Sequence, residues 1–197
     1  MESRKYIYIT VGALAVLGFL FYPRRAKAAS YAKRWVGVSE YGFNAAFSNK
    51  VFEDMMRDMG WKGGEAWCMY FAKAVHYNSF KKDAQKIDKI LTGSTQGSFV
   101  NASKDTTKTY KVVTSGRPRL GDIAIWQRVD NPSKGHAAVV IKPKGATFMT
   151  VEGNTNAGGS SEGDKVLIKE RPLKYGEQLP NSSLKLRGFI RKITDII

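Results

Sequence analysis

The sequence predicts an α+β domain in which N-terminal helices pack on an antiparallel β-sheet, preceded by one transmembrane helix. Apolar residues recur at helical spacing up to about residue 80. Short strand-like runs, punctuated by Gly, Pro, Asn and Asp, follow residue 120. With 197 residues, 43% of them hydrophobic, the chain is large enough to bury one sizeable core.

Residues 6–22 form an unbroken apolar run without a charged side chain. At 1.5 Å per residue, about 17 helical residues just cross the hydrocarbon core of a bilayer, and the tyrosines at both ends suit the interface. We therefore expect a single-pass anchor in membrane lipid. The predicted divisions are a short tail (1–5), the transmembrane helix (6–22), a basic linker (23–34) and a globular domain (35–197).

A cleaved signal peptide is the alternative to the anchor, because residues 26–28 have the A-x-A form of a cleavage site, although two arginines precede them. Sidedness is a separate question. More Lys and Arg follow the apolar run than precede it, so the positive-inside rule would leave the domain in the cytoplasm. A protein in the membrane of a virus particle, rather than in a bacterial cell envelope, would escape that consequence.

The first helix expected in the domain covers residues 47–59, where apolar residues, three of them methionines, recur at helical spacing. Ser48 or Asn49 can cap its start and Gly60 can end it, and we expect the methionines in the core. A segment with two glycines follows, and a second helix begins near Trp67.

Strands are predicted in the second half of the chain, each bounded by turn residues. Asp122 is expected to cap the turn before the first of them, and the tryptophans at 67 and 126 are expected to form core or cleft walls, where either could stack on a sugar. Residues 81–119, rich in Lys, Ser and Thr, show no clear pattern. The predicted strands are 121–127, 136–141, 146–152, 165–170 and 186–192.

The chain carries 32 Lys and Arg against 17 Asp and Glu, a formal net charge of +15. Such a balance indicates an anionic partner: nucleic acid, an acidic membrane surface or a bacterial wall polymer. One cysteine excludes an intramolecular disulfide, and one cysteine with two histidines cannot form a structural zinc site. We expect no metal and no cofactor.

The only cysteine, Cys68, lies in "GGEAWCMYFAKAV", near the first turn of the second predicted helix. The helix dipole and unpaired N–H groups stabilise a thiolate at such a position, which makes it a candidate nucleophile. A small buried hydrophobe is the competing interpretation. A nucleophile needs a base, and His76 would lie about 12 Å along the same helix, too far for a hydrogen bond. His136, which opens a predicted strand, is the remaining candidate.

A hairpin argument suggests the third member of the group. If residues 143–145 form a three-residue loop with Gly145 in the left-handed region, His136 lies directly opposite Glu152. Both side chains then share one face, where the carboxylate can orient the imidazole. Asn154 has the same strand parity as Glu152 and is the alternative orienting group.

At these residues the sequence resembles the CHAP family of papain-like cysteine peptidases and amidohydrolases that cut peptidoglycan. The resemblance rests on "GGEAWCMYFAKAV", "GDIAIW", "GHAAVVI" and "VEGNTN", in this order, and spans roughly residues 35–190. It implies a papain-like fold with Cys68 as nucleophile, His136 as general base and then acid, Glu152 as the orienting group and Asn154 as an accessory polar residue. The unpatterned segment 81–119 departs from the family pattern, and we interpret it as a substrate-side loop.

The resulting hypothesis is a membrane-anchored peptidoglycan hydrolase, either a cysteine endopeptidase or an N-acetylmuramoyl-L-alanine amidase, that serves a bacteriophage virion as a lytic enzyme during wall penetration. Virion or envelope proteins would be further partners. The alternative is a non-enzymatic membrane protein that uses a papain-like scaffold to bind DNA or another anionic polymer. A third hypothesis is a cysteine peptidase or transferase that acts on a protein near the membrane.

Overall fold

The computed structural model of the chain describes residues 24–156 and 163–193. The expected tail (1–5) and transmembrane helix (6–22) lie outside these residues. Among the helices that the structure describes, none is long and apolar enough to cross a membrane.

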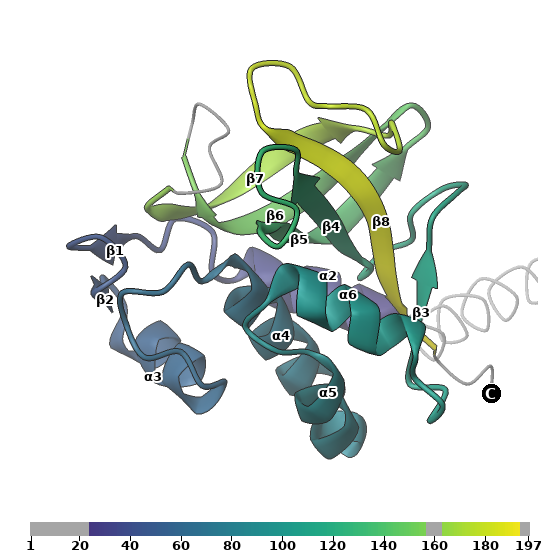
Figure 1. The fold of residues 1–197 in the computed structure, drawn as a ribbon. Helices are drawn as coiled ribbons and strands as arrows, with labels where there is room; N and C mark the ends of the chain where they lie inside the picture. The colour runs from purple at the N-terminus through teal and green to yellow at the C-terminus, as the bar shows by residue number, and fades with distance from the viewer. Residues whose placement is uncertain (1–23, 157–162, 194–197) are drawn as a thin grey trace, which may run out of the picture.

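Six strands form one antiparallel sheet, as the sequence predicts, in the order β3-β8-β4-β5-β6-β7. The sheet is strongly curved and lies above the helices in Figure 1. Each of the five predicted strands is present, and one further strand, β3, was not predicted. The strands are β3 (Tyr110–Val113), β4 (Ile123–Arg128), β5 (Gly135–Lys144), β6 (Thr147–Thr155), β7 (Lys165–Pro172) and β8 (Leu184–Lys192).

Helices cover one face of the sheet, and α4 runs through the centre of the helical layer (Figure 1). Its residues are buried on nearly every side, because it packs against α2, α3 and α5 as well as β5 and β6. The helices are α2 (Arg24–Lys33), α3 (Lys50–Asp58), α4 (Cys68–Ser79), the 3₁₀ turn η1 (Lys81–Asp83), α5 (Ala84–Ile90) and α6 (Thr95–Ser103). A small hairpin of β1 (Glu40–Tyr41) and β2 (Ala46–Phe47) precedes α3.

Helix α3 forms where the sequence predicts it. The Asn49 side chain caps its start by accepting the N–H of Phe52 at 3.0 Å, and Gly60 follows its end with φ 97°. Met55 and Met56 are buried, which confirms that the methionine stripe belongs to the core. Val51 differs from the predicted stripe, because 69% of it is exposed.

Residues 23–34, expected to be a basic linker, instead contain α2. Alanines 28, 29 and 32 are buried in the main core, where α2 packs on α4, β5 and β6. Small side chains allow this close approach although the helix carries four basic residues. The A-x-A site at 26–28 lies inside this helix, so cleavage there would remove one of its packed turns.

The unpatterned segment 81–119, expected to be a substrate-side loop, instead forms η1, α5, α6 and β3. These elements were not predicted because α5 and α6 are short and α6 contains Gly, Asn, Ser and Thr, which are weak helix formers. A cap supports α6: the Ser94 hydroxyl accepts the N–H of Gly97 at 3.0 Å.

Two apolar clusters hold the layers together. The larger one lies between the helices and the sheet. The second lies on the other face of the sheet, where Trp126, Phe148 and Phe189 pack beneath the segment that joins β7 to β8. Both tryptophans that the sequence placed in core or cleft walls, Trp67 and Trp126, are fully buried, which leaves neither ring exposed to stack on a sugar.

Candidate active site

Cys68 is the first residue of α4 and is 4% exposed. The residue before it, Trp67, is the N-cap, and no side chain caps the helix there. The first-turn N–H groups therefore receive no hydrogen bond from the N-cap side chain, and such groups can bind an anion. Tight turns lead into this helix, since Gly63 and Gly64 have φ values of 81° and 71°.

Two contacts fix Trp67 and with it the start of α4. The indole Nε1 donates to the carboxylate of Glu40 in the β1–β2 hairpin. On the other side, Gly153 of β6 lies so close that a Cβ built on it would meet the Trp67 ring at 2.4 Å. The nucleophile helix is thus pinned between the hairpin and the sheet.

His136 is the second residue of β5 and is fully buried. Its Nε2 lies 2.9 Å from Oε2 of Glu152. Its other nitrogen, Nδ1, is buried without a hydrogen bond of standard geometry to any residue that the structure describes. The ring nitrogen that does not contact Glu152 is therefore free to exchange a proton with the Cys68 thiol, which interacts with this ring.

The charge environment of His136 favours its protonated form. Burial alone lowers the pKa of His136, but hydrogen bonding and charge interactions with Cys68 and Glu152 outweigh it and raise the pKa to about 9. The imidazole is therefore protonated at neutral pH, with a carboxylate at one nitrogen and the sulfur on the other side.

Glu152 accepts hydrogen bonds from three neighbouring side chains in the interior. Besides His136, Arg171 donates from Nε to Oε1 at 2.8 Å and from Nη2 to Oε2 at 2.6 Å, and the Thr150 hydroxyl donates to Oε1 at 2.7 Å. Burial raises the pKa of the Glu152 carboxyl, but Arg171 and His136 outweigh it and hold that pKa well below its usual range. Glu152 is therefore an ionised, fixed partner for the imidazole.

The predicted pair of His136 and Glu152 forms, but the predicted hairpin register is wrong. Lys144 pairs with Thr147, so the loop has two residues instead of three and the register at the tip is shifted by three from the expected pairing. An irregularity between Val140 and Lys142 then shifts the register back by one. Val139 consequently lies opposite Val151. The net shift is two residues, which preserves the face of each side chain, and His136 reaches Glu152 along the diagonal.

Asn154 lies two residues beyond Glu152 on β6, 1% exposed and in the left-handed region with φ 55°. The ladder between β6 and β7 is irregular at this point. Gly145 has the left-handed conformation that the hairpin argument required, with φ 74°. The carboxylate of Glu152 makes the hydrogen bond to Nε2 of the His136 ring in this structure.

His76 does not join this group, as its position along the helix predicts. It is fully buried, with Nδ1 2.8 Å from the Tyr110 hydroxyl and Nε2 2.9 Å from the carbonyl oxygen of Gly121. Asp122 caps the adjacent turn as expected, accepting the N–H of Arg119 at 2.7 Å, and is also paired with Arg191.

Sequence reasoning missed Arg171, Thr150 and Glu40. Arg171 reaches Glu152 from the neighbouring strand β7, and its guanidinium also lies 5.6 Å from the Trp126 ring centroid. Arg171 directly follows the predicted strand 165–170 and is visible in the sequence as a charged residue in a strand. Its partner could not be predicted, because that depends on the register between β6 and β7. Within 24–156 and 163–193, the acidic, histidine and cysteine side chains form no cluster suited to a metal ion.

Residues 60–154 match the CHAP domain family. The matched region covers slightly less than half of the chain and includes Cys68, His136, Glu152 and Asn154. No curated protein matches the chain. The family match supports a peptidase or amidase of the CHAP type and suggests peptidoglycan as the substrate, and the mixed arrangement of helices and sheet is consistent with a CHAP fold.

Proposed function

We propose that this protein is a cysteine hydrolase that cleaves a peptide or amide bond of peptidoglycan, with Cys68 as nucleophile, His136 as general base and acid, and Glu152 as the orienting group. One observation carries the proposal: a buried imidazole is hydrogen-bonded to a buried carboxylate through Nε2 and interacts with the lone thiol, while Nδ1 makes no hydrogen bond of standard geometry to a residue that the structure describes. A merely structural histidine would have both nitrogens satisfied, as His76 does.

The first half of the reaction forms a thioester. The Cys68 thiolate attacks the carbonyl carbon of the scissile amide, and the C–N bond breaks as the protonated His136 gives its proton to the departing amine. The high pKa of His136 keeps that proton on the ring until the amine takes it. The amine product leaves with the proton, and the acyl group remains on the sulfur.

The second half returns the enzyme to its starting state. Neutral His136 takes a proton from water, the hydroxide attacks the thioester carbonyl, and the C–S bond breaks to release a carboxylic acid. Cys68 and His136 are left as the thiolate and imidazolium pair. The uncapped N–H groups at the start of α4, that of Cys68 first, would stabilise the negative oxygen in both tetrahedral intermediates.

Arg171 and Thr150 act through Glu152 rather than on the substrate. Three of their donors hold the carboxylate in one plane, so that it presents a fixed oxygen to Nε2 of His136. Arg171 also keeps Glu152 ionised despite its burial. The proposed function therefore depends on a chain of four side chains behind the nucleophile.

The substrate proposal rests on the CHAP match and on charge. A protein with a formal net charge of +15 is attracted to the anionic polymers of a bacterial wall. The cross-bridge, the stem peptide and the sugar-to-peptide amide are the three bonds that such a hydrolase could cut. The apolar run at 6–22 supports a membrane setting, and we propose that the domain is tethered to a virion or envelope membrane while it acts on the wall.

Purified peptidoglycan incubated with the wild type and with Cys68→Ala, followed by mass spectrometry of released fragments, tests the proposal. New amine ends made only by the wild type are expected, and the fragment masses identify the bond. A shortened protein for this assay should keep residue 24 onward, because α2 is part of the core. Equal release by both proteins, or none from several wall types by the folded wild type, would contradict it.

The non-enzymatic alternative keeps one observation in its favour, the exposed basic side chains of the segment around residues 80–120. Salt-sensitive binding of duplex DNA that survives Cys68→Ala, together with no wall cleavage by the wild type, would favour this function. The third hypothesis, a transferase, would be recognised by a product with a new amide in place of a free acid.

A further inference from the structure

Six basic side chains from four separate stretches of the chain surround the place where α2 begins. We call this set the basic collar. Five of its members are exposed and the arginine of α2 is half-buried. Its members are Arg25, Lys81, Lys82, Lys111, Arg117 and Arg119.

The end of β8 brings these stretches together. Lys192 is paired with Asp83 of η1 at 2.8 Å, and its carbonyl oxygen accepts from Arg25 Nη2 at 3.5 Å. Next to it, Arg191 lies opposite Lys111 of β3 and donates to the carbonyl oxygen of Arg117 at 3.1 Å. Figure 1 shows α2, β3 and the end of β8 converging at one side of the molecule.

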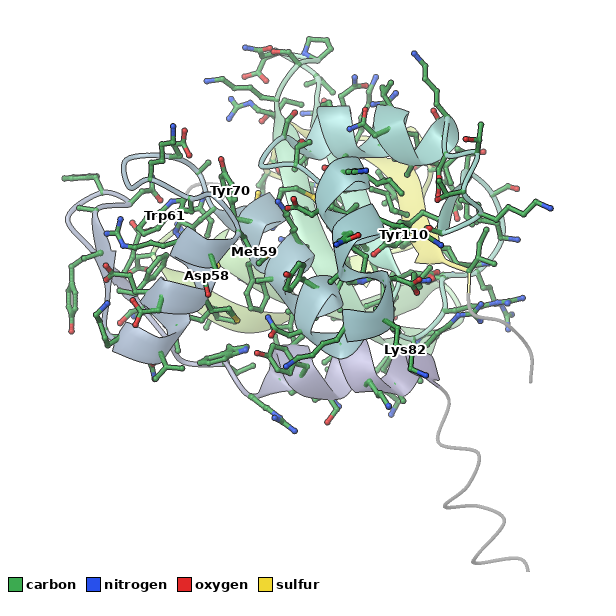
Figure 2. The ribbon with its side chains drawn as sticks, turned by 90° about the horizontal axis from the view of Figure 1, so that it is seen from below. Asp58, Met59, Trp61, Tyr70, Lys82 and Tyr110 are labelled. Atoms are coloured by element: carbon green, nitrogen blue, oxygen red, sulfur yellow. The ribbon has the colours of Figure 1, made fainter. Side chains whose placement is uncertain are left out.

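The turn before β4 closes the collar on the other side of α2. A Cβ built on Gly121 would lie 2.6 Å from the carbonyl oxygen of Arg25, so this turn presses on the first turn of α2. Burial and the nearby Arg119 lower the pKa of Arg25, which shows that these two cations share one neighbourhood. Figure 2 shows Lys82 at the same side of the molecule as the start of α2.

The collar has a positive charge that its surroundings do not neutralise. Asp83 and Asp122 are the acids at its centre, and both are paired with buried cations, Lys192 and Arg191. In the part of the chain that the structure describes, no collar residue forms an ion pair. The collar therefore attracts an anionic surface.

The sequence places an apolar run next to this charge. Residues 6–22 carry no charged side chain, and α2 begins at residue 24, only two positions later. Basic residues immediately beside a membrane-length apolar run lie at the level of lipid headgroups. The fold brings further basic side chains, about 60 to 90 positions away in the sequence, to the same headgroup level.

We propose that the basic collar docks the domain onto an anionic lipid surface, with the proposed active site turned away from the membrane. Helix α4 sets the separation: Cys68 is its first residue and η1 follows its last, so 12 residues at 1.5 Å each place Cys68 about 18 Å along the helix axis from Lys81 and Lys82. A nucleotide backbone would offer similar phosphate charge, but the apolar run beside the collar favours lipid.

Lysine modification in lipid nanodiscs tests the docking without any measurement of activity. The full chain is assembled in discs of phosphatidylcholine alone and in discs with 30% phosphatidylglycerol, treated with an amine-reactive acetyl ester, and analysed by mass spectrometry. We expect Lys81, Lys82 and Lys111 to react at least threefold more slowly in the anionic discs, with the protection lost at 0.5 M salt. The exposed Lys62 and Lys165, near the opposite end of α4, should react equally in both.

A matched pair of double reversals completes the experiment. Lys81→Glu with Lys82→Glu should abolish the protection of Lys111, whereas Lys62→Glu with Lys165→Glu, which changes net charge by the same amount, should preserve it. Equal reaction in both discs, or failure of the chain to associate with anionic discs, would overturn the proposal. Protection of the collar lysines by duplex DNA but not by anionic discs would also overturn it, in favour of nucleic acid. Either result would leave the proposed hydrolase intact.

Discussion

His136 is held between two groups that both favour its protonated form, and this makes its ionisation the most informative property at the scale of single residues. The raised pKa depends on Glu152 at one nitrogen and on Cys68 on the other side, since burial acts in the opposite direction. The ring must be protonated to release the amine. Its loss of that proton should therefore limit the proposed reaction at high pH.

We expect kcat/KM of the wild type on a wall-derived peptide to fall as the pH rises through about 9. Glu152→Gln removes one of the two interactions that raise the pKa of His136, so its alkaline limb should move to lower pH and its maximum should drop. The measurement is a pH profile of both proteins between pH 5 and 10. An alkaline limb that stays at the same pH in the variant would show that Glu152 does not act on the ring.

Arg171 offers a second test, because it should act on the opposite limb of the profile. Arg171→Met removes the first cause that lowers the pKa of Glu152, so the carboxyl protonates at higher pH and the acid limb should shift upward. Breaking a buried ion pair also costs about 3–5 kcal/mol of stability. Arg171→Lys keeps the charge but loses the two-pronged contact, and it should restore the acid limb in part. A variant that lost stability without a change in profile would mark Arg171 as structural only.

At the scale of elements, the closest contact in the site lies between α4 and β6. Gly153 of β6 has no side chain, which allows Trp67 to pack directly against the strand that carries Glu152. The contact fixes the height of Cys68 relative to the His136 and Glu152 pair. A methyl group at this position would separate the helix from the strand.

Gly153→Ala should therefore destabilise the domain by more than 2 kcal/mol and lower kcat by at least tenfold, because the new Cβ would meet Trp67 at 2.4 Å and Phe71 at 3.1 Å. Gly145→Ala is the control: it meets nothing within 4 Å and costs only about 1–2 kcal/mol through its left-handed φ. Urea unfolding and single-turnover rates of both variants would measure the difference. Equal losses of kcat would contradict this role of Gly153.

The sequence predicts those elements whose pattern is local and misses those that depend on partners. Asn49 and Gly60 mark the ends of α3, and alternating apolar runs mark the strands, because capping and burial act within a few residues. The prediction for residues 81–119 was wrong because the helices there are short and are stabilised by contacts with α4 and the sheet. The predicted hairpin register was wrong from the turn onward, because the loop has two residues instead of three, and a bulge near residue 141 changed it again; no local pattern reveals either feature.

The pairing of His136 with Glu152 was predicted despite that error in register. An even shift in register preserves the face of each side chain, so Glu152 remained within reach of His136. Arg171 could not be predicted in the same way, because its contact with Glu152 depends on the register between β6 and β7, which is irregular next to Glu152. The sequence therefore predicted the pair of His136 and Glu152 but not the arginine that binds Glu152 from the next strand.

At the scale of the whole molecule, His76 joins the helical layer to the sheet. It lies on α4 and accepts from the Tyr110 hydroxyl of β3 at Nδ1, while its Nε2–H donates to the carbonyl oxygen of Gly121 before β4. The contact in which Nδ1 accepts needs the neutral ring, whereas the bond to Gly121 would survive protonation. Burial lowers the pKa of His76 to about 3, so the folded domain resists protonation at a point where three elements meet.

The stability of the domain should consequently fall on mild acidification. The pKa of His76 is near 6.5 in the unfolded chain and about 3 in the folded protein, so its stabilising contribution is complete above pH 6.5 and declines as the pH falls toward 3. Between pH 6.5 and 5 the loss should be about 2 kcal/mol. His136 does not contribute to the loss of stability between pH 6.5 and 5, since it is protonated in both the folded and the unfolded state below its unfolded pKa near 6.5. Glu152 loses its contribution only below about pH 4.5, its ordinary pKa.

Urea unfolding of the wild type and of His76→Gln at pH 6.5 and 5 would isolate this effect. The variant should be less stable at both values, because it loses a well-packed ring, but its free energy of unfolding should change little between them. The wild type should lose about 2 kcal/mol over the same interval. An equal loss in both proteins would assign the pH dependence to other groups. It would also remove the reason to regard the junction of α4, β3 and β4 as the part of the fold most sensitive to acid.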